Sequence, residues 1–199
     1  MYRAIATILM LVVFTSCSEK GFRKISSDED YIINAKVFPQ KFNKLVYDSE
    51  FNLYGRVITG LTIIKKTDSS YRFVSMSELG IKYFDIEFFQ NKSLAPKVHY
   101  IMDVLNKKPL IKRLTGDLSI LFINPGNGEK IKLNENSVDI LSNGYIYGIT
   151  SSEIREIKIK KCIRSSKPLY MINYNEKQFP SKVEIERAKF KISLIEISK

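Results

Sequence analysis

The chain has little of what metal sites and nucleophilic hydrolases require. Its 199 residues include one histidine, His99, and two cysteines, Cys17 and Cys162. Histidine-based zinc sites need several nitrogen or sulfur ligands, and a serine triad needs a histidine beside its nucleophile. One histidine with no partner in the sequence pattern argues against both kinds of site. We therefore expect no metal, no cofactor and no catalytic activity.

Long apolar runs are also missing. The longest run, about Ala4 to Phe14, is too short for a membrane-spanning helix, which needs roughly 20 apolar residues. One cation, Arg3, precedes this run, and the small residues Thr15 and Ser16 follow it. A cation, an apolar run and small residues in this order are typical of a secretory signal peptide, here over residues 1–16.

The residues at the end of this signal carry a more specific pattern. Thr15, Ser16 and Cys17 resemble the bacterial lipobox, although Phe14 stands where leucine is usual. The resemblance implies that Cys17 is acylated and anchors the mature chain to a membrane. Ser18 and Glu19 follow, without the aspartate that retains some lipoproteins at the inner membrane, so we expect the periplasmic side of the outer membrane. The alternative is an ordinary secretory signal followed by an unrelated cysteine.

The remaining cysteine and the net charge have ordinary interpretations. If Cys17 is acylated, Cys162 has no partner, and its alternating apolar surroundings predict a buried structural thiol. The formal charge is +11. The lysines are spread along alternating segments, which indicates a solvated face or attraction to anionic head groups near the anchor. An exported chain is not expected to bind nucleic acid.

The hydrophobic period divides the mature chain into two parts. Residues 17–43 are interpreted as the lipidated N-terminus and tether, with a short helix near residues 31–38 that Pro39 closes. Residues 44–199 are interpreted as one domain. From Leu45 the period is two, which predicts four strands with an irregularity near Asp48 and a tight turn whose Gly80 has a positive φ. The four strands are 45–54, 61–66, 71–77 and 81–89.

The next segment has a helical period. After Pro96, apolar residues at positions 98, 101, 102 and 105 predict an amphipathic helix, which resumes after Pro109 and ends at Gly116. His99 and Asp103 are four residues apart and are expected to pair on its polar face. Further strands are predicted at 118–123, 130–133, 137–141, 145–150, 153–162, 169–174, 182–186 and 190–197, with a hairpin turn at Asn143-Gly144.

These elements predict a mainly β (α+β) fold. We expect about ten or eleven antiparallel strands in a strongly curved, half-open β-barrel, with a helical hairpin inserted after the fourth strand as a lid. Strands 71–77 and 81–89 are partly apolar on both faces. A sheet with one wet face alternates more cleanly, so both faces of this one should be covered.

Several segments resemble uncharacterised bacterial lipoproteins with the LolA/LolB-like lipoprotein-carrier fold. The similar segments are Gly60-Leu61-Thr62-Ile63-Ile64-Lys65, residues 73–82, residues 84–88 and residues 179–186. The resemblance implies a half-open barrel with a helical lid over an apolar cavity that holds acyl chains. It also implies that an anchored member inserts lipoprotein cargo into the outer membrane with an exposed leucine, whose place Leu79 occupies here. The alternative is that Leu79 packs into its own hairpin.

The sequence therefore leaves two main hypotheses and a set of candidate residues. The first is a non-enzymatic lipoprotein that binds acyl chains or lipoprotein cargo; the second is an interaction subunit of an envelope assembly with a filled core. An enzyme is the third and least supported. An accessible apolar cavity would favour the first hypothesis, and a filled interior the second. The candidate cavity residues, which could instead simply pack against one another, are Val74, Met76, Phe84, Ile86, Phe88, Met102 and Leu105.

Overall fold

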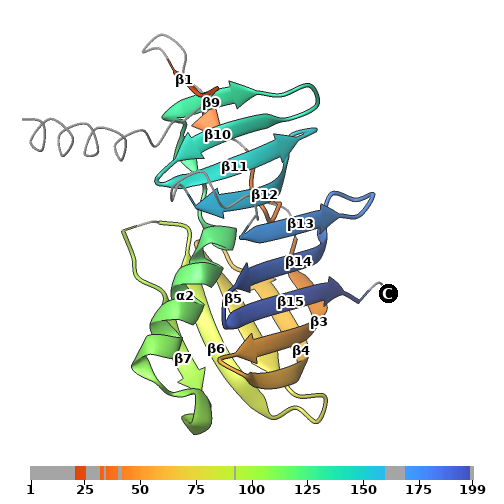
Figure 1. Ribbon diagram of the computed structural model, residues 1–199. Coiled ribbons are helices and arrows are strands. Elements are labelled where there is room, and N and C mark those ends of the chain that lie inside the picture. Colours follow the sequence, from red (N-terminus) through yellow and green to blue (C-terminus); the bar gives the residue numbers. More distant parts are fainter. Residues whose placement is uncertain are drawn as a thin grey trace, which may run out of the picture.

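The computed structural model describes residues 21–25, 32–33, 35–39, 42–91, 93–159 and 169–197. Within them, one antiparallel sheet of thirteen strands dominates, in the order β1-β9-β10-β11-β12-β13-β14-β15-β3-β4-β5-β6-β7. The mainly β prediction is confirmed, with more strands than the ten or eleven expected. The sheet does not close on itself, because β1 and β7 are its two edges. Figure 1 shows it running from β1 and β9 at one end to β4–β7 at the other.

Most strands that are neighbours in the large sheet are also consecutive in the chain. A second, two-stranded sheet pairs β2 with β8. The bounds in the first half are β1 Arg23–Lys24, β2 Ile32–Ile33, β3 Lys44–Leu53, β4 Arg56–Lys66, β5 Ser70–Met76, β6 Lys82–Phe89 and β7 Lys97–Ile101. Those in the second half are β8 Gly126–Asn127, β9 Lys130–Leu133, β10 Val138–Ser142, β11 Tyr145–Thr150, β12 Glu153–Ile159, β13 Tyr170–Tyr174, β14 Pro180–Arg187 and β15 Phe190–Glu196.

The residues in the turns between strands suit the backbone conformations that they adopt. Gly80 has a φ of 81° in the β5–β6 turn, as predicted. Asn143 and Gly144 both have positive φ, which is the backbone that a two-residue hairpin between right-twisted strands needs. Gly60 has a φ of 151°, and a Cβ there would overlap the carbonyl oxygen of Met76, so only glycine lets β4 and β5 approach this closely. The irregularity predicted near Asp48 is wrong, because β3 pairs with β4 continuously through that residue.

The predicted helical pair is partly wrong. Residues 97–101 form β7, and a 3₁₀ turn, η1 (Asp103–Leu105), follows it. A register shift in the β6–β7 pairing places Val98 opposite Ile86 and Ile101 opposite Phe84, so both side chains pack against the core. A bulged strand followed by a turn therefore reproduces the apolar spacing of a helix.

The helix lies further along the chain than predicted. Among the described residues, the one α-helix is α2 (Lys108–Phe122), and Pro109 lies in its first turn, where a missing N–H costs nothing. The helix continues through the strand predicted at 118–123, because Leu118, Leu121 and Phe122 extend its buried stripe. The helix predicted near 31–38 is also wrong, since Ile32–Ile33 pairs as β2 with β8.

Candidate functional site

One face of the sheet, here called the inner face, carries a continuous apolar row. The register places eight side chains directly beside one another across eight adjacent strands, from β9 to β3. Each is at most 4% exposed. The strands of this row therefore share one dry surface. In order, the eight are Ile131, Ile140, Tyr147, Ile157, Tyr170, Ile185, Ile192 and Phe51.

Helix α2 covers the inner face next to β5 and β6, as Figure 1 shows. The Phe122 ring stacks on the Phe88 ring at 4.9 Å between centroids and on the Tyr71 ring at 5.1 Å. The Phe38 ring stacks on Phe122 at 5.2 Å, and Phe73 meets it edge-on. Phe122 is therefore enclosed by aromatic rings, each pair of which adds about 0.5 to 1.5 kcal/mol beyond the area it buries.

The predicted cavity residues fall into two groups. Val74 and Met76 lie on the opposite face, here called the outer face, because β5 places Phe73 and Ser75 inward instead. There they are half-buried beside Ile63 and Leu61 of β4. The register therefore rules out one cavity lined by all seven. The remaining five pack in or against the core: Phe84, Ile86, Phe88, Met102 and Leu105.

A partly buried ion pair ties α2 to the strands beside it. Asp117 lies on the buried side of α2 and is 4% exposed. Its Oδ1 is 3.0 Å from an Nη2 of Arg187, at the end of β14. The hydroxyl of Tyr170, on β13, donates to the backbone carbonyl of Asp117 at 2.9 Å. Asp117 Oδ2 and Arg187 Nε are buried without a hydrogen-bond partner, so this contact, here called the α2 latch, is only half satisfied.

The α2 latch has an electrostatic cost. Burial raises the pKa of Asp117, and the charges of Arg187 and Arg113 oppose that rise without cancelling it. Burial, with the charge of Asp117 in second place, also raises the pKa of Tyr170. None of the three residues of the α2 latch, Asp117, Arg187 and Tyr170, was predicted from the sequence pattern. The sequence did carry one signal, because Asp117 lies three residues after Leu114 and continues an apolar stripe of helical period. The strand predicted at 118–123 hid this signal, since the helix was expected to end at Gly116.

The raised pKa of Asp117 has a measurable consequence for stability. Between the ordinary carboxyl pKa and the raised one, the folded chain holds more protons than the unfolded chain, so this group favours folding as the pH falls through that interval. We expect the unfolding free energy of the native chain, relative to Asp117→Asn, to rise on acidification from pH 7 to pH 4. Urea unfolding of both chains across this range measures the difference. Asp103→Asn, in η1, is the matched control. If the difference in unfolding free energy between the native chain and Asp117→Asn falls on acidification, the assignment is contradicted.

Charged residues on the outer face pair across β5, β6 and β7. Arg72 Nε and Nη2 donate to the two carboxylate oxygens of Asp85, and Lys82 Nζ lies 3.1 Å from one of them. Burial alone would raise the pKa of Asp85, but the hydrogen bonds and charges of Arg72 and Lys82 lower it overall. Glu87 lies 2.8 Å from Nε2 of His99, so the predicted pairing of His99 with Asp103 is wrong. The Arg72–Asp85 and Glu87–His99 pairs join neighbouring strands, and the Lys82–Asp85 pair lies within β6, so these contacts have a structural role.

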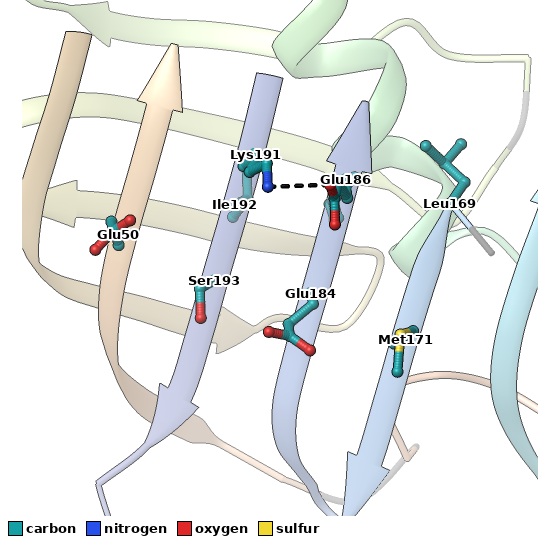
Figure 2. Close-up of a pocket in the computed structure, with 9 residues that line it drawn as sticks. Glu50, Leu169, Met171, Glu184, Glu186, Lys191, Ile192 and Ser193 are labelled. Carbon is teal, nitrogen blue, oxygen red and sulfur yellow. Dashed lines mark ion pairs between the residues drawn. The ribbon is translucent and has the colours of Figure 1, made fainter. Parts of the chain in front are cut away.

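The outer face also holds a polar groove of about 320 Å³ over β13, β14, β15 and β3. Figure 2 shows its carboxylates on two strands, Glu50 on β3 and Glu184 with Glu186 on β14, and β15 lies between these strands. Glu184 pairs with Lys182 and Glu186 with Lys191, each at 3.0 Å. Across the residues whose placement is described, no group of three or more His, Cys, Asp or Glu side chains is arranged to hold a metal ion.

The β5–β6 turn presents an apolar tip. Leu79 is 90% exposed and Ile81 is 56% exposed, so the alternative that Leu79 packs into its hairpin is wrong. The turn is compact, since Gly80 N donates to the Ser77 carbonyl at 2.9 Å and Ile81 N donates to Ser77 Oγ at 3.0 Å. Leu79 is therefore held outward by a short, hydrogen-bonded turn.

The lipidation prediction lies outside the structural description. Cys17, the signal segment and Cys162 are among the residues that the structure does not describe. In the part of the chain that it does describe, no helix is both long and apolar enough to cross a membrane. No protein-family model matches the sequence, and no curated protein matches it as a relative.

Proposed function

We propose that this chain is a lipid-anchored, non-catalytic lipoprotein of the bacterial envelope that binds an acyl chain, or the acylated end of another lipoprotein, between α2 and the inner face of the sheet. The proposed anchor is Cys17, at the periplasmic side of the outer membrane. The curved sheet then acts as a half-open barrel and α2 as its lid. The observation that carries this proposal is the uninterrupted apolar row of the inner face.

Binding beneath α2 requires the helix side chains to give way. Phe122 and the leucines of α2 occupy the space that an acyl chain would take. An acyl chain offers the same apolar contact to the sheet, so the inner face stays buried when an acyl chain replaces these side chains. The half-satisfied α2 latch lowers the cost of moving the helix, because Asp117 and Arg187 regain hydration when they separate.

The absence of tryptophan provides a clean test. Phe122→Trp places a single indole at the proposed site, and a fatty acid brominated along its chain quenches an indole that it contacts. We expect saturable quenching in the mature chain with Cys17→Ser, at fatty-acid concentrations below micelle formation. Tyr100→Trp, on β7 and 43% exposed, is the matched control and should show little quenching. Equal quenching at both positions, or no saturable binding, would remove the acyl-binding proposal.

A second candidate is an interaction subunit without a ligand. The filled interior around Phe122 and the outward Leu79 favour it, because an isolated protruding leucine fits a partner's pocket as well as it fits lipid. A photo-crosslinking residue at position 79 tests this candidate in cells. A discrete protein adduct at position 79, absent from a matched probe at Lys177 in the β13–β14 turn, is expected only if a partner binds there.

A further inference from the structure

The α2 latch joins acceptors on the helix to hydrogen-bond donors on the sheet. Arg187 contributes a guanidinium from β14, and the Tyr170 hydroxyl of β13 donates to the backbone carbonyl of Asp117. Figure 1 shows the C-terminal part of α2 beside β13 and β14. Asp117 moves with α2, so a helix that moves aside takes both acceptors away and leaves the donors on the sheet.

We propose that the ligand held beneath α2 is a free fatty acid, whose carboxylate replaces that of Asp117 at Arg187. This inference rests on the proposed acyl-binding function and names its ligand class. A guanidinium that an apolar tail covers is costly unless an anion pairs with it. A fatty acid supplies that anion at the end of its chain. The acylated end of a lipoprotein carries its chains on neutral ester and amide groups and supplies none.

The native latch leaves Arg187 incompletely paired. Its Nη2 contacts Asp117, whereas its Nε is buried without a hydrogen-bond partner. On the outer face, by contrast, Nε and Nη2 of Arg72 both donate to the two carboxylate oxygens of Asp85. A carboxylate that is not fixed to α2 can contact Arg187 in this two-pronged way. The incomplete pairing therefore favours exchange of Asp117 for a ligand carboxylate.

Asp117 keeps a cation when it leaves Arg187. Arg113 lies four residues earlier on α2, which places it on the same side of the helix. Burial raises the pKa of Asp117, and the charges of both Arg187 and Arg113 oppose that rise, so Arg113 already acts on this carboxylate. Because Arg113 moves with the helix, the residue that needs a new anion is Arg187 on the sheet.

The tail of the ligand then follows apolar surfaces. Arg187 comes two residues after Ile185 on β14, so both side chains lie on the inner face. Ile185 belongs to the apolar row and lies opposite Tyr170. Phe122 lies five residues after Asp117 on α2, about 7.5 Å further at 1.5 Å per residue. A chain held by its carboxylate at Arg187 therefore reaches the aromatic rings around Phe122.

Two forms of one ligand separate the head group from the tail. The mature chain with Cys17→Ser and Phe122→Trp is titrated with a brominated fatty acid and with its methyl ester, which lacks the negative charge. We expect the acid to bind about 10-fold more tightly, the effect of one hydrogen bond to a charged group. Equal affinities would overturn the carboxylate at Arg187 and leave the acyl site intact. No saturable quenching by either form would remove the acyl site, and this inference with it.

Substitutions on the two sides of the latch have opposite expected effects. Arg187→Gln should weaken binding of the acid by about 10-fold and change binding of the ester by less than about twofold. Asp117→Asn removes the competing carboxylate and should strengthen binding of the acid alone. Binding of the ester reports in each variant that the site is folded.

Arg72→Gln is the matched control, because it breaks an arginine–aspartate pair on the outer face. It should leave the ratio of the acid and ester affinities unchanged. An Arg187→Gln chain that keeps the native ratio, or an Asp117→Asn chain that binds the acid more weakly, would overturn the inference. If Arg187→Gln does not fold, Asp117→Asn decides alone.

Discussion

Phe122→Ala is expected to lower the free energy of unfolding by about 3 to 5 kcal/mol, the usual cost of removing a buried phenylalanine side chain. Phe122 is 6% exposed and stacks on Phe88, Tyr71 and Phe38, so its loss opens a cavity that three rings cannot close without moving. At about 2 to 4 °C per kcal/mol for a chain of this size, the melting temperature should fall by about 10 °C. Urea and thermal unfolding measure both quantities.

The matched control removes an apolar side chain from the surface. Leu79→Ala changes a residue that is 90% exposed, and its effect should stay within about 0.5 kcal/mol. A loss below about 1 kcal/mol for Phe122→Ala would show that α2 is not packed on the sheet in solution. Phe122→Ala is also informative about binding, because an acyl chain that occupies the space left by the Phe122 ring should restore part of the lost stability.

Cys17→Ser is expected to move the protein from the membrane fraction to the soluble periplasmic fraction. Each buried acyl CH₂ contributes about 0.8 kcal/mol, so two or three chains hold a protein on a membrane and their loss releases it. Mass spectrometry of the native mature chain should find acyl groups on its first residue. Cys162→Ser is the control and should fractionate as the native chain does. Unchanged membrane fractionation of Cys17→Ser, with the signal segment removed, would contradict the anchor.

The local hydrophobic pattern was sufficient to predict the strands where neighbours in the sheet are also consecutive in the chain. The strands now described as β3, β5 and β6 were predicted to within one residue at each end, because alternation with a period of two and the turn at Gly80 specify a meander locally. The strand β4 was also predicted, but it begins five residues earlier than expected, at Arg56. The hairpin at Asn143-Gly144 was predicted for the same reason. In both cases the turn residues adopt the positive φ that their chemistry favours.

The local pattern was insufficient where a remote contact decided the structure. Val98 and Ile101 have the spacing of a helix, but pairing with β6 and a bulge turn both inward as a strand. Leu118 to Phe122 alternate well enough for a strand, but the packing of Phe122 on Phe88 continues the helix. The Asp117–Arg187 pair joins residues seventy positions apart, which no local spacing reveals.

For the candidate site, too, the local pattern predicted some features and remote contacts decided the others. A period of two marks two faces on every strand but does not say which face will be covered. Val74 and Met76 were grouped with Phe84, Ile86 and Phe88 from the alternation within each strand, and the register of β5 with β6 places the two groups on opposite faces.

By itself, the sequence determined that the described domain is mainly β and antiparallel, because side-chain alternation and turn chemistry are local properties of the chain. The tertiary structure alone decided which face is the interior, that one helix covers part of it, that its rings fill the space beneath, and that Asp117 is buried against Arg187. These outcomes depend on which distant strands pair and in which register, and that choice is made by the free energy of the whole packed sheet.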